Sequence, residues 1–490
     1  MLVAGAGVLS LLGYAVGLRV VAGRGARTLE GYVVLHLVLF LVYLLAVVLV
    51  VRRPAADRVL TGMILAFGLL FRLAVLPSPV MLSSDLYRYL WDGRVQWSGG
   101  NPYRHPPAAE ALRSLRDPDI YPNINRPASP TVYPPGAELT FALVAGLAPN
   151  SILAWRLVVL ACEVATGILI LGLLRRMGAP EPGVLVYAWA PLAVFEGAQA
   201  GHVDFVMLPF LLLALRARQA GRMAQAGAAL GVAVLLKLYP AVLLLAWWRR
   251  GDRRFAAAFA AVVAVGYLAY LGGAGPRVTG FLPRYFGSAE DFNIGLRAFV
   301  EQGIGRFLGE HRVTLGRLAI GAARSAGIVD PGVPLQAFLS PGEEVALRRH
   351  LAMPSEEIGR VLVVQAGHEA VRAVTMLVLF GLLAAVLVRL GRRRGEDPAA
   401  VFRAGMGAVA AYLVLVPTAM HAWYAVWVLP FLAVHPSPAW LWFTGAVSLS
   451  YLKYVWEPAD LPLWVRLVEF LPLYALLVWE WRAGRERRPE

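Results

Sequence analysis

Four short groups of polar residues interrupt an otherwise apolar sequence, and their side chains are of the types that move protons or hold phosphate. The first group runs from Ser83 to Pro107 and carries two carboxylates, Asp85 and Asp92. On a helix, these two acids and Arg88 would share one face, because they lie three and four residues apart. Asp85 is the first acid after an apolar segment and could serve as a general base. The alternative interpretation is a helix along the membrane surface without chemistry.

The second and third groups place a titratable residue at a break in an apolar segment. His202 and Asp204 are two residues apart between two such segments, so both could face one cavity. The simpler alternative is that Asp204 caps the next helix. Lys237 precedes Tyr239 and Pro240 inside an apolar segment, where a charge is costly and tends to mark function. For Lys237 the alternative is a lysine that extends to the interface from the end of a span.

The fourth group, Met420 to Tyr424, opens a late apolar segment after Pro417 and contains His421. This histidine could contact a substrate, or it could belong to an aromatic belt at the interface. Lysine usage draws further attention to Lys237, because only two of the 46 lysine and arginine residues are lysines.

Composition predicts that the elements which position these groups are transmembrane helices. The chain has 490 residues, 59% hydrophobic and 16% charged, whereas roughly 25% of residues are charged in an ordinary soluble protein. We therefore expect an all-α polytopic transmembrane helical bundle, a single domain over residues 1–490, with about 11 to 14 spans. The first span lacks a basic leader and is expected to be retained rather than cleaved. The expected spans cover residues 2–22, 32–51, 59–77, 136–149, 152–174, 183–199, 203–217, 224–248, 255–274, 361–390, 401–418, 421–434, 437–456 and 461–481.

Two long loops lie between the expected spans. The first, residues 78–135, carries the Asp85 group together with Arg104, His105 and Tyr133. It ends in Tyr-Pro-Pro, which is typical of a helix start, because a proline in the first turn replaces an N–H group that has no partner. The second covers residues 278–360.

Charge and cysteine content exclude several classes of function. The net charge of +15 comes almost entirely from arginines in short loops. On a membrane protein such loops report orientation and contact with anionic membrane lipids, so nucleic acid is not an expected partner. Cys162 is the only cysteine, which rules out an internal disulfide and a cysteine metal site.

Arginine clusters also predict the orientation of the chain. Arg52, Arg53 and Arg58 come directly after the second expected span. If this cluster is cytoplasmic, the Asp85 loop lies on the outer face, because basic loops are retained inside.

Two later arginine clusters conflict with a simple alternation of spans. They come after the expected spans 203–217 and 224–248, so they flank a single span and would lie on opposite sides of the membrane. The conflict indicates that one expected span does not cross, and Pro240 is placed to break the span over 224–248.

Taken in order, the polar motifs resemble a known superfamily. They are Tyr-x-Tyr-x-Trp-Asp-Gly-Arg at residues 87–94, Gly-Asn-Pro-Tyr at 100–103, Tyr-Pro-Pro at 133–135, Gly-His-x-Asp at 201–204, Lys-x-Tyr-Pro at 237–240 and His-x-Trp-Tyr at 421–424. Their order and spacing resemble the GT-C superfamily of glycosyltransferases, in particular the bacterial polyprenyl-phosphate-mannose-dependent mannosyltransferases.

This resemblance implies an enzyme that moves a sugar, mannose, from a polyprenyl-phosphate donor to a lipid or glycan acceptor at the outer face of the cell (plasma or inner) membrane. It implies that Asp85 is the general base, or the ligand of a divalent metal ion, Mg or Mn. The chain departs from a paired acidic motif, because Ser84 precedes Asp85. The leaving lipid phosphate needs a fixed cation, which Lys237, or Arg104 with His105, could supply. The expected substrate-binding residues are Arg88, Asp92, Arg104, His105, Tyr133, His202, Asp204, Lys237, Tyr239 and His421.

Two other classes of function also fit a chain of many spans. A transporter or flippase of lipid-linked sugars predicts internal symmetry, with broken helices at corresponding places in two halves. Pro240 could break one span, but no matching break is evident in a second repeat. A non-catalytic scaffold gives no reason for Lys237 or for acids inside apolar segments.

Overall fold

The computed structural model describes residues 1–51, 57–249, 251–282, 292–293, 295–309, 311–325, 355–392, 397–417, 419–455 and 461–486. Within these ranges every regular element is a helix, apart from one isolated bridge between Phe292 and Ala419. The expected all-α fold is therefore confirmed. Arg52 and Arg53, on which the predicted orientation partly rests, lie outside the described residues, as does much of the expected loop 278–360.

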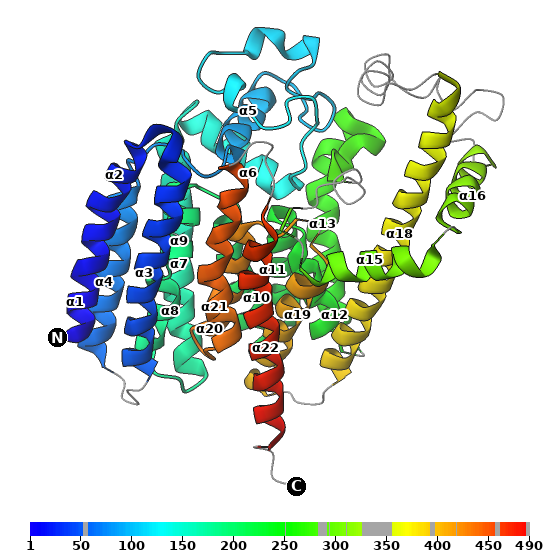
Figure 1. Ribbon diagram of the computed structural model, residues 1–490. Helices are drawn as coiled ribbons and strands as arrows, with labels where there is room; N and C mark the ends of the chain where they lie inside the picture. The colour runs from blue at the N-terminus through cyan, green and yellow to red at the C-terminus, as the bar shows by residue number, and fades with distance from the viewer. Residues whose placement is uncertain are drawn as a thin grey trace.

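The helices stand roughly side by side, with the long loop after α4 covering one end of the bundle (Figure 1). The first part of the chain contributes α1 (Leu2–Leu12), α2 (Leu18–Ala22), α3 (Thr28–Val51), α4 (Arg58–Val75), α5 (Asp85–Trp97), α6 (Pro135–Leu147) and α7 (Ile152–Arg176). The middle contributes α8 (Leu185–Ala188), α9 (Pro191–Val194), α10 (Asp204–Gln219), α11 (Met223–Leu236), α12 (Val242–Trp247) and α13 (Arg253–Ala274). The last part contributes α15 (Leu296–Leu308), α16 (His311–Ser325), α18 (Ser355–Arg392), α19 (Pro398–Leu415), α20 (Leu429–Leu432), α21 (Pro438–Ala446) and α22 (Leu463–Glu486).

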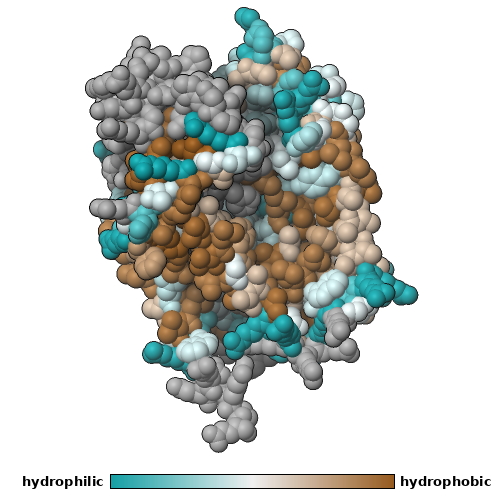
Figure 2. Space-filling view, turned by 90° about the vertical axis from the view of Figure 1, so that its right-hand side faces the viewer, coloured by the Kyte–Doolittle hydropathy of each residue, from teal (hydrophilic) through white to brown (hydrophobic). Residues whose placement is uncertain are grey.

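Long apolar runs form helices here because lipid offers no partner for backbone N–H and C=O groups, which a helix pairs within itself. Side chains cap several helix starts. The carboxylate of Asp57 accepts a hydrogen bond from the N–H of Leu60 at 2.9 Å, and the hydroxyl of Ser151 accepts one from the N–H of Ala154 at 3.1 Å. A broad apolar band lies between hydrophilic ends on the face shown in Figure 2.

The described helices make this a multi-pass membrane protein. Seven are long and apolar enough to cross a membrane, or eight if the bent pair Pro191–Gln199 and Asp204–Gln219 counts as one span. Three shorter apolar helices, Pro135–Leu147, Met223–Leu236 and Ala422–Leu432, accompany them. These numbers lie below the expected 11 to 14 because several of the expected segments are short or broken.

The expected span over 224–248 does not cross as one helix. α11 ends at Leu236, Lys237 adopts an extended backbone, and α12 begins only after Pro240. The carbonyl oxygen of Trp247, the last residue of α12, accepts a hydrogen bond from Arg218 at 2.7 Å, and Arg218 lies at the end of α10, just before α11. α11 and α12 thus form a hairpin that leaves from the end of the bundle where it entered.

This hairpin removes the conflict between the arginine clusters. Arg218 also pairs with Asp252 at 2.6 Å, so the clusters after α10 and α12 lie at one end of the bundle. The loop that carries Asp85 lies at the other end (Figure 1). The two arginine clusters therefore lie at the end of the bundle opposite the Asp85 loop, and the orientation itself stays a prediction.

Candidate active site

A cavity of about 620 Å³ opens beneath the loop that precedes α6. Its wall combines segments far apart in the chain: the start of α5, the end of the 78–135 loop, the break between α11 and α12, and the stretch after α19. Of the expected site residues, those on the wall are Asp85, Arg88, Tyr133, Lys237, Tyr239 and His421. The fold therefore brings together three of the four polar groups predicted from the sequence on the wall of one cavity.

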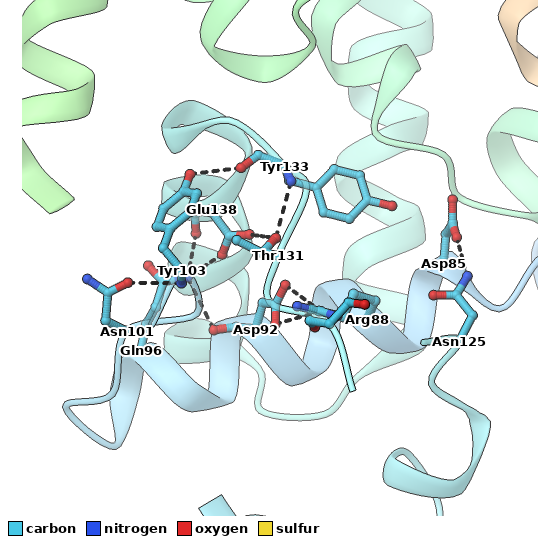
Figure 3. Close-up of polar contacts among 11 residues, drawn as sticks. Asp85, Arg88, Asp92, Gln96, Asn101, Tyr103, Asn125, Thr131, Tyr133 and Glu138 are labelled. Atoms are coloured by element: carbon cyan, nitrogen blue, oxygen red, sulfur yellow. Dashed lines mark hydrogen bonds and ion pairs between the residues drawn. The ribbon is translucent and has the colours of Figure 1, made fainter. Parts of the chain in front are cut away.

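Asp85 is the first residue of α5, and its side chain is 18% exposed. The side-chain amide of Asn125 donates a hydrogen bond to Oδ1 at 2.7 Å. Oδ2 lies 3.9 Å from Nδ1 of His202. Figure 3 shows the Asp85–Asn125 pair at one end of α5, apart from the other polar contacts of this helix. A carboxylate at the first turn is stabilised by the helix dipole, and this one is available to the cavity.

Arg88 pairs with Asp92 rather than with Asp85. Its Nε donates to both carboxylate oxygens of Asp92 at 2.8 Å, and both residues are buried. Glu138 lies behind them, where it accepts hydrogen bonds from Thr131 at 2.6 Å and from Gln96 at 3.0 Å (Figure 3). Burial raises the pKa of the Asp92 carboxyl above its usual value. The positive charge of Arg88 acts in the opposite direction but does not cancel the effect of burial. Asp92 is absent from the cavity wall, and it holds Arg88, which in turn donates to the carbonyl oxygen of Ser129 in the loop at 3.0 Å.

Lys237 reaches the cavity at the break between α11 and α12, and its side chain is 17% exposed. Its Nζ donates to Oδ2 of Asp204 at 3.1 Å, while Oδ1 of Asp204 accepts a hydrogen bond from the indole of Trp427 at 2.7 Å. Asp204 makes no capping hydrogen bond to α10, so the alternative of a helix cap is not what the structure shows. Nor does Lys237 extend to the interface, because its partner is a fully buried carboxylate.

Aromatic rings surround the Lys237 ammonium. It lies 5.2 Å from the ring centre of Tyr424 and 6.0 Å from that of Tyr133. Tyr239 stacks on Trp427 with ring centres 3.6 Å apart. The cation is thus held by one carboxylate and by rings, and it points into a space that a second anion could enter.

Besides Asp92, the expected residues away from the cavity wall fall into two groups. Arg104 and His105 lie in the 78–135 loop, where their backbone N–H groups bond to Asn101, and the structure does not place them on the wall. His202 and Asp204 lie directly behind it, buried and in contact with Asp85 and Lys237 respectively. Among the cations proposed to neutralise a lipid phosphate, Lys237 is the one in the cavity.

Sequence reasoning did not find several residues of this site. Asn125 and Arg126 come from the 78–135 loop, and both line the cavity. Glu196 was also missed, although an acid inside the apolar segment 183–199 was a usable signal. Nothing in the sequence marked Asn125, because its contact with Asp85 joins residues forty positions apart.

The residues around Asp85 do not resemble the ligands of a metal site. Among the described residues, no three histidine, cysteine, aspartate or glutamate side chains are grouped so that they could hold a metal ion. The neighbours of the Asp85 carboxylate are an amide donor and an imidazole 3.9 Å away. A divalent ion such as Mg²⁺ prefers several oxygen ligands, and this set of neighbours does not fit that preference.

The fold is that of a helical membrane protein, and its site places a carboxylate and a lysine on the wall of one cavity. Residues 131–292 match the sequence model of glycosyltransferase family 87. The match covers Tyr133, His202, Asp204, Lys237 and Tyr239, and it supports glycosyl transfer as the reaction. No curated protein and no solved structure gives a significant match to the chain.

Proposed function

We propose that the protein transfers a sugar, mannose, from a polyprenyl-phosphate donor to the hydroxyl of a lipid or glycan acceptor, at the outer face of the cell membrane. The observation that carries this proposal is that Asp85 and Lys237 line the same cavity. The carboxylate of Asp85 can accept a proton from the acceptor hydroxyl, and the ammonium of Lys237 can bind the phosphate of the donor. The motifs at residues 201–204 and 237–240 lie inside the segment that matches glycosyltransferase family 87, which supports the proposal.

In the proposed reaction, the acceptor oxygen attacks the anomeric carbon of the donor sugar. The bond between acceptor oxygen and anomeric carbon forms while the bond from that carbon to the phosphate oxygen breaks. The electron pair of the broken bond leaves on the phosphate, and the acceptor proton moves to the carboxylate of Asp85. General-base assistance of this kind contributes about 10²–10⁴-fold in rate. Direct displacement inverts the configuration at the anomeric carbon.

Lys237 would stabilise the negative charge that develops on the leaving phosphate. Asp204 holds the ammonium in place before the substrate arrives, so no reorganisation is needed during the reaction. Because a lysine ammonium is a point charge with three rotatable donors, it can contact Asp204 and a phosphate oxygen at the same time.

The aromatic wall suits a sugar bound next to a charged phosphate. Tyr133, Tyr239, Trp423 and Tyr424 line the cavity, and rings of this kind pair an apolar face with a polar tip. The apolar helices that surround it would accommodate the polyprenyl chain, because its hydrocarbon gains nothing from contact with water.

A transporter of lipid-linked sugars is the competing function. It predicts broken helices at corresponding places in two halves of the chain. The described residues contain two breaks, between α9 and α10 and between α11 and α12, and both lie in the middle third of the chain. Both breaks contribute residues to the site that contains Asp85. This arrangement favours a catalytic role for the breaks over the internal symmetry of a transporter.

The test is a transfer assay with purified protein in lipid. Radiolabelled polyprenyl-phosphate mannose and polyprenyl-phosphate glucose are each offered with a panel of lipid and glycan acceptors. We expect transfer from the mannose donor, slowed by about 10²-fold or more in Asp85→Asn. Transfer from the glucose donor alone would overturn the choice of sugar. Movement of intact donor across the membrane, without product, would favour the transporter.

A further inference from the structure

Behind the cavity wall, a chain of buried polar groups leads away from Asp85. The imidazole of His202 is next, with Nδ1 at 3.9 Å from Oδ2 of Asp85 and Nε2 at 3.2 Å from Oε2 of Glu196. The phenol of Tyr451 then donates to the carboxylate of Glu196, at 2.9 Å and 3.0 Å from its two oxygens. The side chains of His202 and Glu196 are 1% and 0% exposed.

The backbone places His202 in a sharp turn between two helices. The chain bends by 116° between Pro191–Gln199 and Asp204–Gln219. A π-type turn over Phe195–Gln199 precedes the bend, and such turns are frequent at functional sites. Gly201 has a φ of +76°, a conformation open to glycine, and a Cβ there would lie 3.1 Å from Leu86 and Trp155. His202 is thus presented to α5 from a fixed turn.

The ring of His202 is also held on its face. It stacks on the indole of Trp423 with ring centres 3.9 Å apart and an angle of 17° between planes. His421, which lines the cavity, stacks on the same indole at 4.3 Å. Stacking fixes the plane of the imidazole, and the contact with Glu196 fixes its rotation in that plane.

A purely structural histidine would satisfy its ring nitrogens with well-formed hydrogen bonds. Neither nitrogen of His202 makes one, although both are buried. Instead, one nitrogen faces Asp85 and the other faces Glu196. A buried polar group without a good hydrogen bond is costly, and it calls for an explanation beyond packing.

From this geometry we propose that His202 is a positioning residue for the Asp85 carboxylate, and that Glu196, locked by Tyr451, positions His202. Asn125 holds Oδ1 of Asp85 from the loop side, and His202 faces Oδ2 from the buried side. The carboxylate then presents a constant orientation to the acceptor hydroxyl. This inference rests on the proposed function, because it assigns His202 a role through Asp85. His202 itself is too deeply buried to touch the substrate.

The test compares four single variants in the transfer assay, with kcat and the donor KM measured for each. His202→Phe keeps the ring on Trp423 but removes both nitrogens. We expect kcat to fall about 10- to 100-fold, with donor KM nearly unchanged, because a misplaced catalytic group costs turnover more than binding. His202→Asn keeps a polar side-chain amide that can face Asp85 or Glu196, and it should keep more turnover than His202→Phe. His36→Phe is the matched control for the loss of a buried imidazole, because His36 is absent from the cavity wall and pairs with the phenol of Tyr32 at 3.2 Å. This change should lower thermal stability without an equal fall in kcat.

Glu196→Gln is the fourth variant, and it tests the same chain without altering the His202 ring. Glutamine keeps the size and an acceptor for Tyr451, so loss of turnover here would come from the lost charge beside His202. If His202→Phe does not fold, as judged by polyprenyl-phosphate stabilisation in a thermal unfolding assay, Glu196→Gln decides the inference alone.

A double variant separates positioning from general packing. If His202 acts through Asp85, adding His202→Phe to Asp85→Asn should lower the residual turnover no further, whereas an independent packing role would give additive losses. Additive losses, or a wild-type kcat in both His202→Phe and Glu196→Gln, would overturn the inference while an inactive Asp85→Asn still upheld the proposed function. If the wild-type protein transfers no sugar, the proposed function itself fails.

Discussion

Lys237 and Asp204 form an ion pair with 3.1 Å between Nζ and Oδ2. Lys237 lies at the break after α11, and Asp204 is the first residue of α10. The pair places a positive charge at the cavity in the interior of a bundle where a lone ammonium would be costly. Because Asp204 is fully buried and Lys237 is not, the carboxylate supports the lysine while the lysine faces the substrate.

We predict that Lys237→Met slows transfer by about 10²-fold or more, since removing one preorganised group from a developing anion costs about that much. The measurement is kcat and apparent donor affinity with the polyprenyl-phosphate sugar. Lys453→Met is the matched control, because Lys453 is the other lysine of the chain and is absent from the cavity wall. Equal transfer rates and donor affinities in wild type and Lys237→Met would refute the assignment.

Asp85→Asn should lower turnover by about 10²-fold or more with the donor still bound, because the amide keeps the shape of the side chain but cannot accept the proton. Asp92→Asn should cost much less in turnover, since Asp92 is absent from the cavity wall and contacts Arg88. Its effect should instead be seen in thermal stability, because a buried arginine loses its charged partner. Equal losses of turnover from the two changes would remove Asp85 from its special role.

Gly93→Ala should destabilise the protein by about 1–3 kcal/mol, the usual range for overpacking. A Cβ at Gly93 would lie 2.5 Å from the carbonyl oxygen of Phe141, so α5 would have to move away from α6. Gly62→Ala is the control, because a Cβ there meets nothing within 4 Å and alanine favours the helix. Thermal unfolding in detergent gives the comparison, and an unchanged midpoint for Gly93→Ala would mean that the helices pack less closely than described.

The predicted orientation of the chain in the membrane can be tested by labelling single cysteines introduced into a Cys162→Ala variant. Ser98→Cys lies exposed after α5, and Ala220→Cys lies exposed in the turn after α10, at the end that carries Arg218. In spheroplasts, a membrane-impermeant maleimide should label the first and not the second, because basic loops stay inside. The reverse pattern would place the Asp85 loop in the cytoplasm.

The sequence predicted the helical fold and the positions of the seven long spans because burial in lipid leaves a strong, local signal in apolar runs. It could not tell that the segment 224–248 turns back, since Pro240 can kink a span as well as break it. Only the contact of Arg218 with Trp247 shows which of these happens.

The site was predictable in its residue types but not in its pairings. Arg88 could have paired with either acid on its helix; in the fold it pairs with Asp92 and also donates to the carbonyl oxygen of Ser129 in the loop. Likewise, the pairing of Lys237 with Asp204 joins residues thirty-three positions apart, a distance over which periodicity carries no information. The relation of Glu196 to Tyr451 spans 255 positions and belongs wholly to the tertiary fold.

The α11–α12 hairpin also decides on which side of the membrane the later helices begin and end. Because it enters and leaves on the same side, it contributes an even number of passes and does not invert the sidedness of the later helices. Ser437, which comes after α20, bonds to Glu480 near the end of α22, and Figure 1 places the C-terminus at the end of the bundle away from α5. A reporter fused to the C-terminus should therefore share its compartment with the turn at Ala220. Shortening the hairpin would move Lys237 out of the cavity without turning any later helix over.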